Sequence, residues 1–169
     1  LYILAVSSVG VVGIILAGWS SYNKWSLYGA MRAAAQIISY EIPIGLTLLL
    51  AVIVVGSLNL GDIVQWQADH RWFIFHSPFT FIAFFIYFIS VVAETNRTPF
   101  DIPEAESELV AGWMTEFSGF KWSIFFMSEY ANMLIVSLVA SFVFLGGWLS
   151  PFTIFNILPE SWLLLDGFY

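Results

Sequence analysis

The sequence of 169 residues contains no cysteine. Without thiols, the chain cannot form a disulfide framework, a thiolate-held zinc site, an iron–sulfur cluster or a cysteine nucleophile. The sequence also has no nucleotide-binding glycine pattern, no Ser/His/Asp set and no metal-ligand set. We therefore expect no catalytic residue or metal in this chain, and any redox cofactor should be bound non-covalently or belong to a partner.

Charge is scarce as well. Only 10% of the residues are charged, and the five Lys and Arg residues are scattered along the chain. A nucleic-acid interface needs clustered basic residues, so no nucleic-acid partner is expected. Soluble domains carry about 25% charged residues, and this chain falls far below that value.

Apolar and aromatic residues take the place of the missing charge. Sixty per cent of the residues are hydrophobic, the mean hydropathy is +0.87, and there are 17 Phe, 8 Trp and 7 Tyr. Amphipathic rings collect at the headgroup levels of a bilayer. This composition predicts a multi-pass, all-α membrane protein with the lipid bilayer as its surroundings.

Four apolar segments are long enough to cross a hydrocarbon core as helices. We expect them at about residues 1–20, 33–58, 72–93 and 122–148, with an interfacial tail at residues 150–169. Together they form one membrane domain over residues 1–169. The chain starts with Leu1 inside an apolar stretch, so we interpret it as a fragment of a longer protein.

The basic residues predict the orientation of the four spans. Lys24, Arg32, Arg97 and Lys121 fall on one side, and Arg71 alone falls on the other. The positive-inside rule then places residues 94–121, the connection between the last two spans, in the cytoplasm or the mitochondrial matrix. We call this connection the acidic loop, because half of the 12 carboxylates lie between residues 94 and 116.

Three carboxylates on different spans are expected to share one depth in the membrane. Glu41 and Glu129 should lie roughly 10–12 Å below the inner surface, and Glu94 should lie where the third span ends. A charged group in hydrocarbon is costly, so each is a functional candidate. For one such Glu, a structural acid that is ion-paired or protonated is about equally plausible. Three acids at one depth favour the functional interpretation.

Within the acidic loop, Asp101 and Glu104 have the spacing of a capping box, which predicts a short helix at about residues 102–111. On it Glu104 and Glu108 share a face and Glu106 points away, so like charges crowd together. Such groups are suited to exchange protons near neutral pH. A solvated acidic face is the alternative, and it is disfavoured by the apolar residues Phe100, Leu109, Val110 and Trp113.

The remaining polar residues have structural interpretations. His70 and His76 lack the spacing of a helical metal pair, and we expect them to anchor the chain at the opposite interface. Gln36 and Asn132 are expected to hold helices together rather than to bind a ligand.

Three stretches of this sequence resemble a known family. They are residues 32–41 (RAAAQIISYE), residues 94–112 (ETNRTPFDIPEAESELVAG) and residues 129–132 (EYAN). They closely resemble subunit 1, called the H subunit in bacteria, of NADH:quinone oxidoreductase, respiratory complex I. The family is about twice as long, and this chain resembles its central portion.

The resemblance implies a membrane subunit that forms the quinone-binding chamber and couples quinone reduction to proton translocation. By motif, Arg32, Arg97, Phe100, Asp101, Glu104, Glu106 and Glu108 would belong to the chamber, and Glu41, Glu94 and Glu129 to the proton path. The substrate would be ubiquinone, bound non-covalently, with no metal, flavin or iron–sulfur cluster in this chain. The partners would be other membrane-arm and peripheral-arm subunits, in the mitochondrial inner membrane or, alternatively, a bacterial plasma membrane.

Two other interpretations keep the same acids. One is the equivalent subunit of a membrane-bound hydrogenase or a plastid dehydrogenase, which differs in its electron acceptor. The other is an ion or proton transporter that uses Glu41, Glu94 and Glu129 as a relay. The transporter is disfavoured because the three acids lie toward one side and leave the outer half of the spans without ionisable residues.

Overall fold

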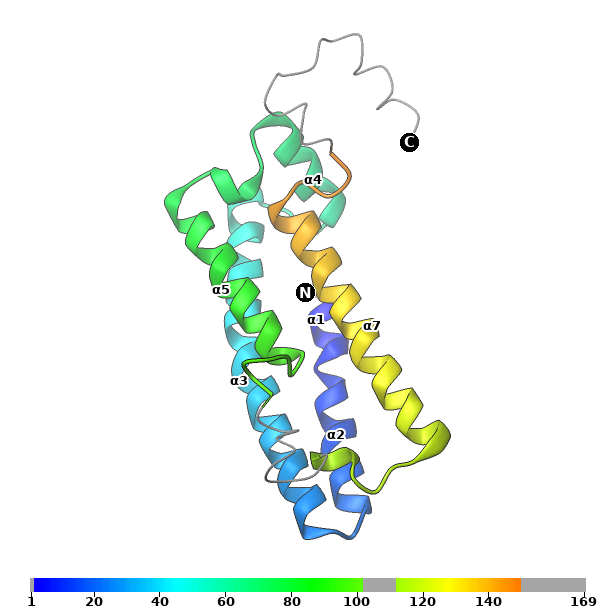
Figure 1. Cartoon of the computed structure of the whole chain (residues 1–169). Helices are drawn as coiled ribbons and strands as arrows, with labels where there is room; N and C mark the ends of the chain where they lie inside the picture. The colour runs from blue at the N-terminus through cyan, green and yellow to red at the C-terminus, as the bar shows by residue number, and fades with distance from the viewer. Residues whose placement is uncertain (1, 102–111, 150–169) are drawn as a thin grey trace.

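The computed structural model describes residues 2–101 and 112–149, and within these ranges it contains helices and no strand (Figure 1). Most of the helices run along the long axis of the molecule, and α4 lies at one end (Figure 1). The elements are α1 (Tyr2–Ser7), α2 (Val9–Ser20), α3 (Lys24–Val55), α4 (Leu60–Asp69), η1 (Phe73–Phe75), α5 (Pro78–Glu94), η2 (Gly112–Met114) and α7 (Gly119–Phe144).

The predicted all-α membrane fold is confirmed. Helices α3 and α7 are long and apolar enough to cross a membrane, and two shorter apolar helices are present at Ala5–Ser20 and Pro78–Glu94. The 32 residues of α3 span about 48 Å. Because this exceeds a hydrocarbon core of about 30 Å, part of α3 must lie beyond the core.

The start of α3 differs from the sequence expectation. The helix begins at Lys24 rather than near residue 33, because the Asn23 side chain accepts a hydrogen bond from the Trp25 backbone N–H and caps the first turn. It ends at Val55 and is capped by Gly56, whose φ of 77° suits glycine. Lys24 and Arg32 therefore belong to the helix and not to a connection, and Glu41 lies in its middle.

Local capping also shifts the other boundaries. The third apolar helix begins at Pro78 rather than Trp72, because Ser77 and Thr80 form a capping box. The polar connection before it contains α4, a helix that the apolar pattern does not predict. The fourth apolar helix, α7, begins at Gly119 and ends at Phe144 instead of continuing to residue 148. The predicted short helix at residues 102–111 and the tail at residues 150–169 lie outside the described residues.

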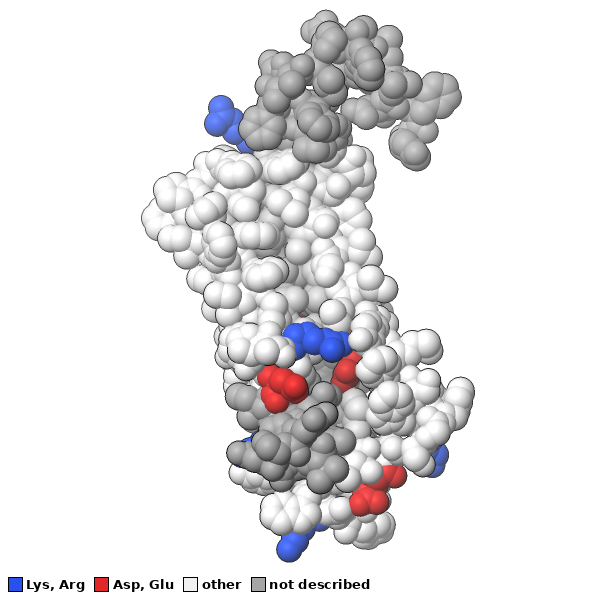
Figure 2. All heavy atoms as spheres, in the orientation of Figure 1, with Lys and Arg blue, Asp and Glu red and all other residues white. Residues whose placement is uncertain are grey.

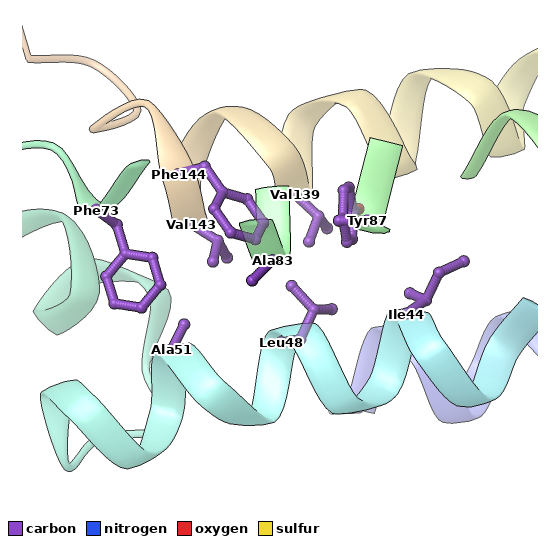
Figure 3. Packing of buried hydrophobic residues seen from close by; sticks show 9 residues of the cluster. All are labelled: Ile44, Leu48, Ala51, Phe73, Ala83, Tyr87, Val139, Val143 and Phe144. Carbon is purple, nitrogen blue, oxygen red and sulfur yellow. The ribbon is translucent and has the colours of Figure 1, made fainter. Parts of the chain in front are cut away.

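The main core lies toward the α4 end of the molecule, where α3, α5, α7 and η1 meet. Its buried side chains point toward one another in Figure 3. They are Ile44, Leu48, Ala51, Phe73, Ala83, Tyr87, Val139, Val143 and Phe144. Burial of this apolar surface holds the three long helices together at this end.

A buried amide strengthens the same end. The Gln67 side chain of α4 is fully buried, and its Nε2 donates to the backbone oxygens of Phe142, at 2.9 Å, and Val143, at 3.2 Å. Its Oε1 accepts from the Phe73 backbone N–H at 3.1 Å. The end of α7 is thus fastened to α4 and η1 by hydrogen bonds as well as by packing.

A second cluster joins α2, α3 and η2 at the opposite end of the molecule. It contains Ala17, Ala30, Ala33, Trp113 and Met114. Small side chains on α2 and α3 let the two helices approach closely. This cluster places η2, in the second half of the acidic loop, directly against α3.

Candidate functional site

Charged side chains gather around the end of α5 and the start of the acidic loop. Figure 2 shows acidic and basic atoms over the lower half of this face, while the described atoms above them are white apart from basic atoms near the top. Capping and packing fold the α4 end, which is apolar on this face. The carboxylates and the guanidinium group described below lie at the other end.

Glu94 is the last residue of α5 and is buried, with 5% of its surface exposed. Its Oε1 lies 3.5 Å from Nδ2 of Asn132 on α7, a weak hydrogen bond at the limit of the accepted range. Its Oε2 has no hydrogen-bond partner among the described residues. A buried carboxylate with one oxygen unpaired carries a large desolvation cost, so the burial of Glu94 requires a structural or functional explanation.

Two other acids approach Glu94 from different helices. Glu41, on α3, is half-buried and close enough to Glu94 for their charges to interact, and its Oε1 also has no partner among the described residues. Glu129, on α7, lines the same cavity as Glu94. The structure thus brings the three acids toward one region from α3, α5 and α7.

The cavity beside Glu94 has a volume of about 630 Å³. Its walls are mostly apolar and come largely from α1, α2 and α7, and its polar lining includes Glu94, Glu129 and Asn132. Volumes of this size are typical of sites for small organic ligands, and a few polar groups in an apolar wall are their usual pattern. Such a space can hold a small molecule or water next to the carboxylates.

Arg97 supplies a positive charge at the same place. Its Cζ lies 5.0 Å from the centre of the Tyr130 ring, a cation–π contact between the acidic loop and α7. Two of its guanidinium nitrogens, Nε and Nη2, are buried and have no hydrogen-bond partner among the described residues. The start of the loop therefore holds both an acid and a base with unsatisfied hydrogen-bonding capacity.

The first residues of the loop are tied to α3 by Gln36. Its Nε2 donates toward the backbone oxygens of Ala93 and Phe100, both at 2.7 Å, and toward Oδ1 of Asn96 at 3.1 Å. The Phe100 ring packs edge-on against Tyr40, with centroids 5.7 Å apart. Gln36 and Asn132 thus join separate elements through hydrogen bonds, as expected for polar residues between membrane helices.

Of the other predicted chamber residues, the structure describes two. Arg32 lies over the Tyr28 ring of its own helix, at 4.8 Å, and Asp101 is exposed. Glu104, Glu106 and Glu108 lie outside the described residues. At the other end of the molecule, His70 and His76 pack on the Trp66 ring. In the part of the chain that the structure describes, no group of three His, Asp or Glu could hold a metal ion.

Several residues of the site were not singled out from the sequence. Tyr40 and Tyr130 hold Phe100 and Arg97 in place, and Ser26 and Gly29 contact the second half of the loop. Aromatic and small residues are too frequent here for any one of them to stand out. The only available signal was that Tyr40 and Tyr130 each lie next to an acid, Glu41 and Glu129, within a conspicuous motif.

Comparison with known proteins matches residues 1–168 to a family described as NADH dehydrogenase. The H subunit of the NADH-quinone oxidoreductase of Chlorobaculum tepidum is 46% identical over 183 aligned residues, which cover 99% of this chain and 51% of the relative. The H subunit of the Magnetococcus marinus enzyme is 51% identical over 166 residues, which cover 98% of this chain and 47% of the relative. The chain spans about half the length of the curated relatives it matches. On the extent of these matches, the chain belongs to the NADH dehydrogenase family.

Proposed function

We propose that this chain is part of the membrane-embedded H subunit of a NADH:quinone oxidoreductase. In this proposal the acidic loop lines the chamber for the quinone headgroup, with Arg97 and Phe100 at its first turn and Arg32, Asp101, Glu104, Glu106 and Glu108 lining or supporting it. Glu41, Glu94 and Glu129 carry the change in protonation from the chamber into the membrane. The chain contributes to an oxidoreductase and carries no electron carrier itself.

The position of Glu94 carries this proposal. It is a buried carboxylate with one unpaired oxygen among the described residues, it lies on a cavity of ligand size, and it stands at the start of the loop. Its charge interacts with that of Glu41, and Glu129 shares the cavity. A change of charge near the loop would therefore reach acids on three helices.

The chemistry of the substrate fits this arrangement. A quinone takes up two electrons and two protons when it becomes a quinol, and the electrons come from the carriers of partner subunits. Proton uptake in a low-dielectric cavity changes the electrostatic energy of every nearby carboxylate. The loop and the three acids can then pass the redox state of the quinone on as altered protonation or hydration.

The setting of the subunit is part of the proposal. Its partners are the other membrane-arm and peripheral-arm subunits, and its quinone is bound without a covalent link. The relatives named above are bacterial, which supports a bacterial plasma membrane over the mitochondrial inner membrane. The charge bias of the connections supports a loop that faces the cytoplasm.

A pair of substitutions tests the role of the loop in the intact complex. Glu104→Gln and Glu106→Gln should lower quinone-linked turnover and proton pumping, while NADH oxidation by an artificial acceptor stays intact. Asp69→Asn serves as the matched control, because Asp69 is an exposed acid at the far end of the molecule. Normal coupled turnover in both loop variants would contradict the proposal.

Photolabelling separates this function from its rivals. A photoreactive quinone, added to the complex in its membrane, should label peptides between residues 94 and 113. Label confined to other parts of the complex would favour a transporter role for the three acids. Label on this peptide with electrons delivered to protons or to a different acceptor would favour the hydrogenase or plastid relative.

A further inference from the structure

One face of α3 contacts both halves of the acidic loop. Ser26, Gly29 and Gln36 are three and seven residues apart, so they lie in one stripe along the helix. The stripe extends about 15 Å from Ser26 to Gln36. Each of its members contacts the loop near residue 100 or near residue 112.

The second half of the loop rests on the backbone of α3. A Cβ on Gly29 would lie 2.9 Å from the Cα and carbonyl carbon of Gly112 and 2.9 Å from the Trp113 nitrogen, so only glycine allows this approach. Beside it, the buried Ser26 hydroxyl donates to the Trp113 carbonyl at 3.1 Å. Trp113 is itself buried and packs edge-on against Phe125 of α7, at 4.8 Å.

The first half of the loop is held by one amide group. Nε2 of Gln36 has two hydrogens and three acceptors within 3.1 Å, namely the oxygens of Ala93, Asn96 and Phe100. The donor is therefore shared, and it joins the last turn of α5 to the backbone at Phe100. Asn96 has a φ of 50°, and asparagine tolerates this turn better than most residues.

We propose that Ser26, Gly29 and Gln36 form a seat on α3 that sets the position of the acidic loop, and that they are positioning residues for the quinone-linked reaction. The second half of this statement rests on the function proposed above. A helix is a rigid element, so it fixes the two contact points of the loop relative to each other and to Glu41 on the same helix. The acids at positions 104, 106 and 108 lie in sequence between these two points.

Glycine-to-alanine substitutions in the assembled complex test the seat. Gly29→Ala places a methyl group against the backbone of Gly112 and Trp113, whereas Gly45→Ala, in the same helix, meets nothing within 4 Å among the described residues. Loop position is read from the maleimide labelling rate of Ser107→Cys, because the chain has no cysteine of its own. A shift of about 1 Å in positioning groups can cost up to about 100-fold in rate.

We expect Gly29→Ala to change the labelling rate by about threefold or more and to raise the KM for a short-chain quinone by about tenfold. Gly45→Ala should leave both values unchanged. Ser26→Ala is a milder second variant, and Ser39→Ala is its control, because the Ser39 hydroxyl bonds within its own helix, to the Ala35 carbonyl. NADH oxidation by an artificial acceptor should stay intact in all four, which reports normal assembly of the electron-input arm.

The outcomes separate the seat from the proposed function. A changed labelling rate with unchanged quinone kinetics upholds the seat and overturns the proposed role of the loop. An unchanged labelling rate in both Gly29→Ala and Ser26→Ala overturns the seat, whatever the quinone kinetics. Failure of both variants to assemble also overturns it, because the stripe would then serve folding alone.

Discussion

The two ends of α7 differ in the hydrogen bonds that they make with neighbouring elements. At its C-terminal end, the carbonyls of Phe142 and Val143 accept hydrogen bonds from a fully buried Gln67. Near Glu129, by contrast, α7 borders a cavity, and Asn132 reaches Glu94 through a long hydrogen bond. At the first end the buried amide is satisfied, and at the other end carboxylate and guanidinium atoms have no partner among the described residues.

Packing follows the same division. The buried residues of α7 are Val136, Val139, Val143 and Phe144, all in its C-terminal half. In the part of the chain that the structure describes, the N-terminal half of α7 has no fully buried residue. Among the described residues, the α4 end keeps one unpaired buried side-chain atom, the Trp72 indole nitrogen, whereas the unpaired atoms at the other end include those of Glu41, Glu94 and Arg97. An unpaired ionisable group costs more free energy than an unpaired indole N–H, so the end that keeps such groups is the one we expect to be used for chemistry.

The largest effect on stability is expected at the satisfied end. Gln67→Leu removes the acceptor of the buried Phe73 N–H and a shared donor, which should cost about 2–4 kcal/mol. The amount of assembled complex in the membrane should fall, while the surviving complex keeps its KM for quinone. Gln65→Leu, an exposed position of the same helix, is the control. A raised KM in the Gln67 variant would break the division between the two ends.

The charged end should respond in the opposite way. Glu94→Gln keeps the size of the side chain and the contact with Asn132 but removes the charge. Quinone-linked turnover and proton pumping should fall by about tenfold or more, because a neutral amide cannot take up a proton. The thermal stability of the complex should not fall, since the desolvation cost of a carboxylate is gone. A stability loss equal to that of Gln67→Leu would show that Glu94 is structural.

A smaller effect is expected from the contact that holds Arg97. Tyr130→Leu removes the ring beneath the guanidinium, which should cost about 0.5–1 kcal/mol, or about two- to fivefold in quinone-linked turnover. Tyr130→Phe retains the ring face and should behave as the unmodified chain. Equal losses in the two variants would assign the role to the Tyr130 hydroxyl and not to the cation–π contact.

A stability effect of similar size, without an effect on turnover, should come from Tyr87, inside the main core. Its hydroxyl donates to the Val136 carbonyl at 2.9 Å, linking α5 to α7 between the two ends. Tyr87→Phe should cost about 0.5–1 kcal/mol, because that carbonyl also accepts within its own helix. The measurement is thermal inactivation of the complex, with unchanged KM for quinone. A change in KM would place Tyr87 with the charged end.

The amino-acid sequence predicted the elements better than their boundaries. Apolar length alone predicted four apolar helices, because the cost of exposing apolar surface or burying charge depends on residue type. Two of them, α3 and α7, are long and apolar enough to cross a membrane, and the other two correspond to shorter apolar helices. Capping moved the boundaries: Asn23 starts α3 well before residue 33, and Ser77 delays α5 to Pro78. These caps are local contacts of one or two side chains, and Ser8 and Ser118, at the N-caps of α2 and α7, form no such contact.

The sequence likewise identified some residues of the candidate site and missed others. Glu41, Glu94 and Glu129 could be selected from the sequence because an acid in an apolar helix is costly wherever the helix lies. Tyr130, Ser26 and Gly29 could not, because their importance lies in what they face: a guanidinium, a carbonyl and a backbone. Small and aromatic residues carry no such signal until their neighbours are known.

The sequence by itself determined that the chain is a helical membrane protein whose acids concentrate in residues 94–116, since solvent preference is a property of each side chain. Only the tertiary structure decided that Glu41, Glu94 and Glu129 approach one another from three helices and that one stripe of α3 holds both halves of the loop. Meeting of residues far apart in the chain depends on how helices pack. Packing is set by the shapes of many side chains at once, and no local pattern encodes it.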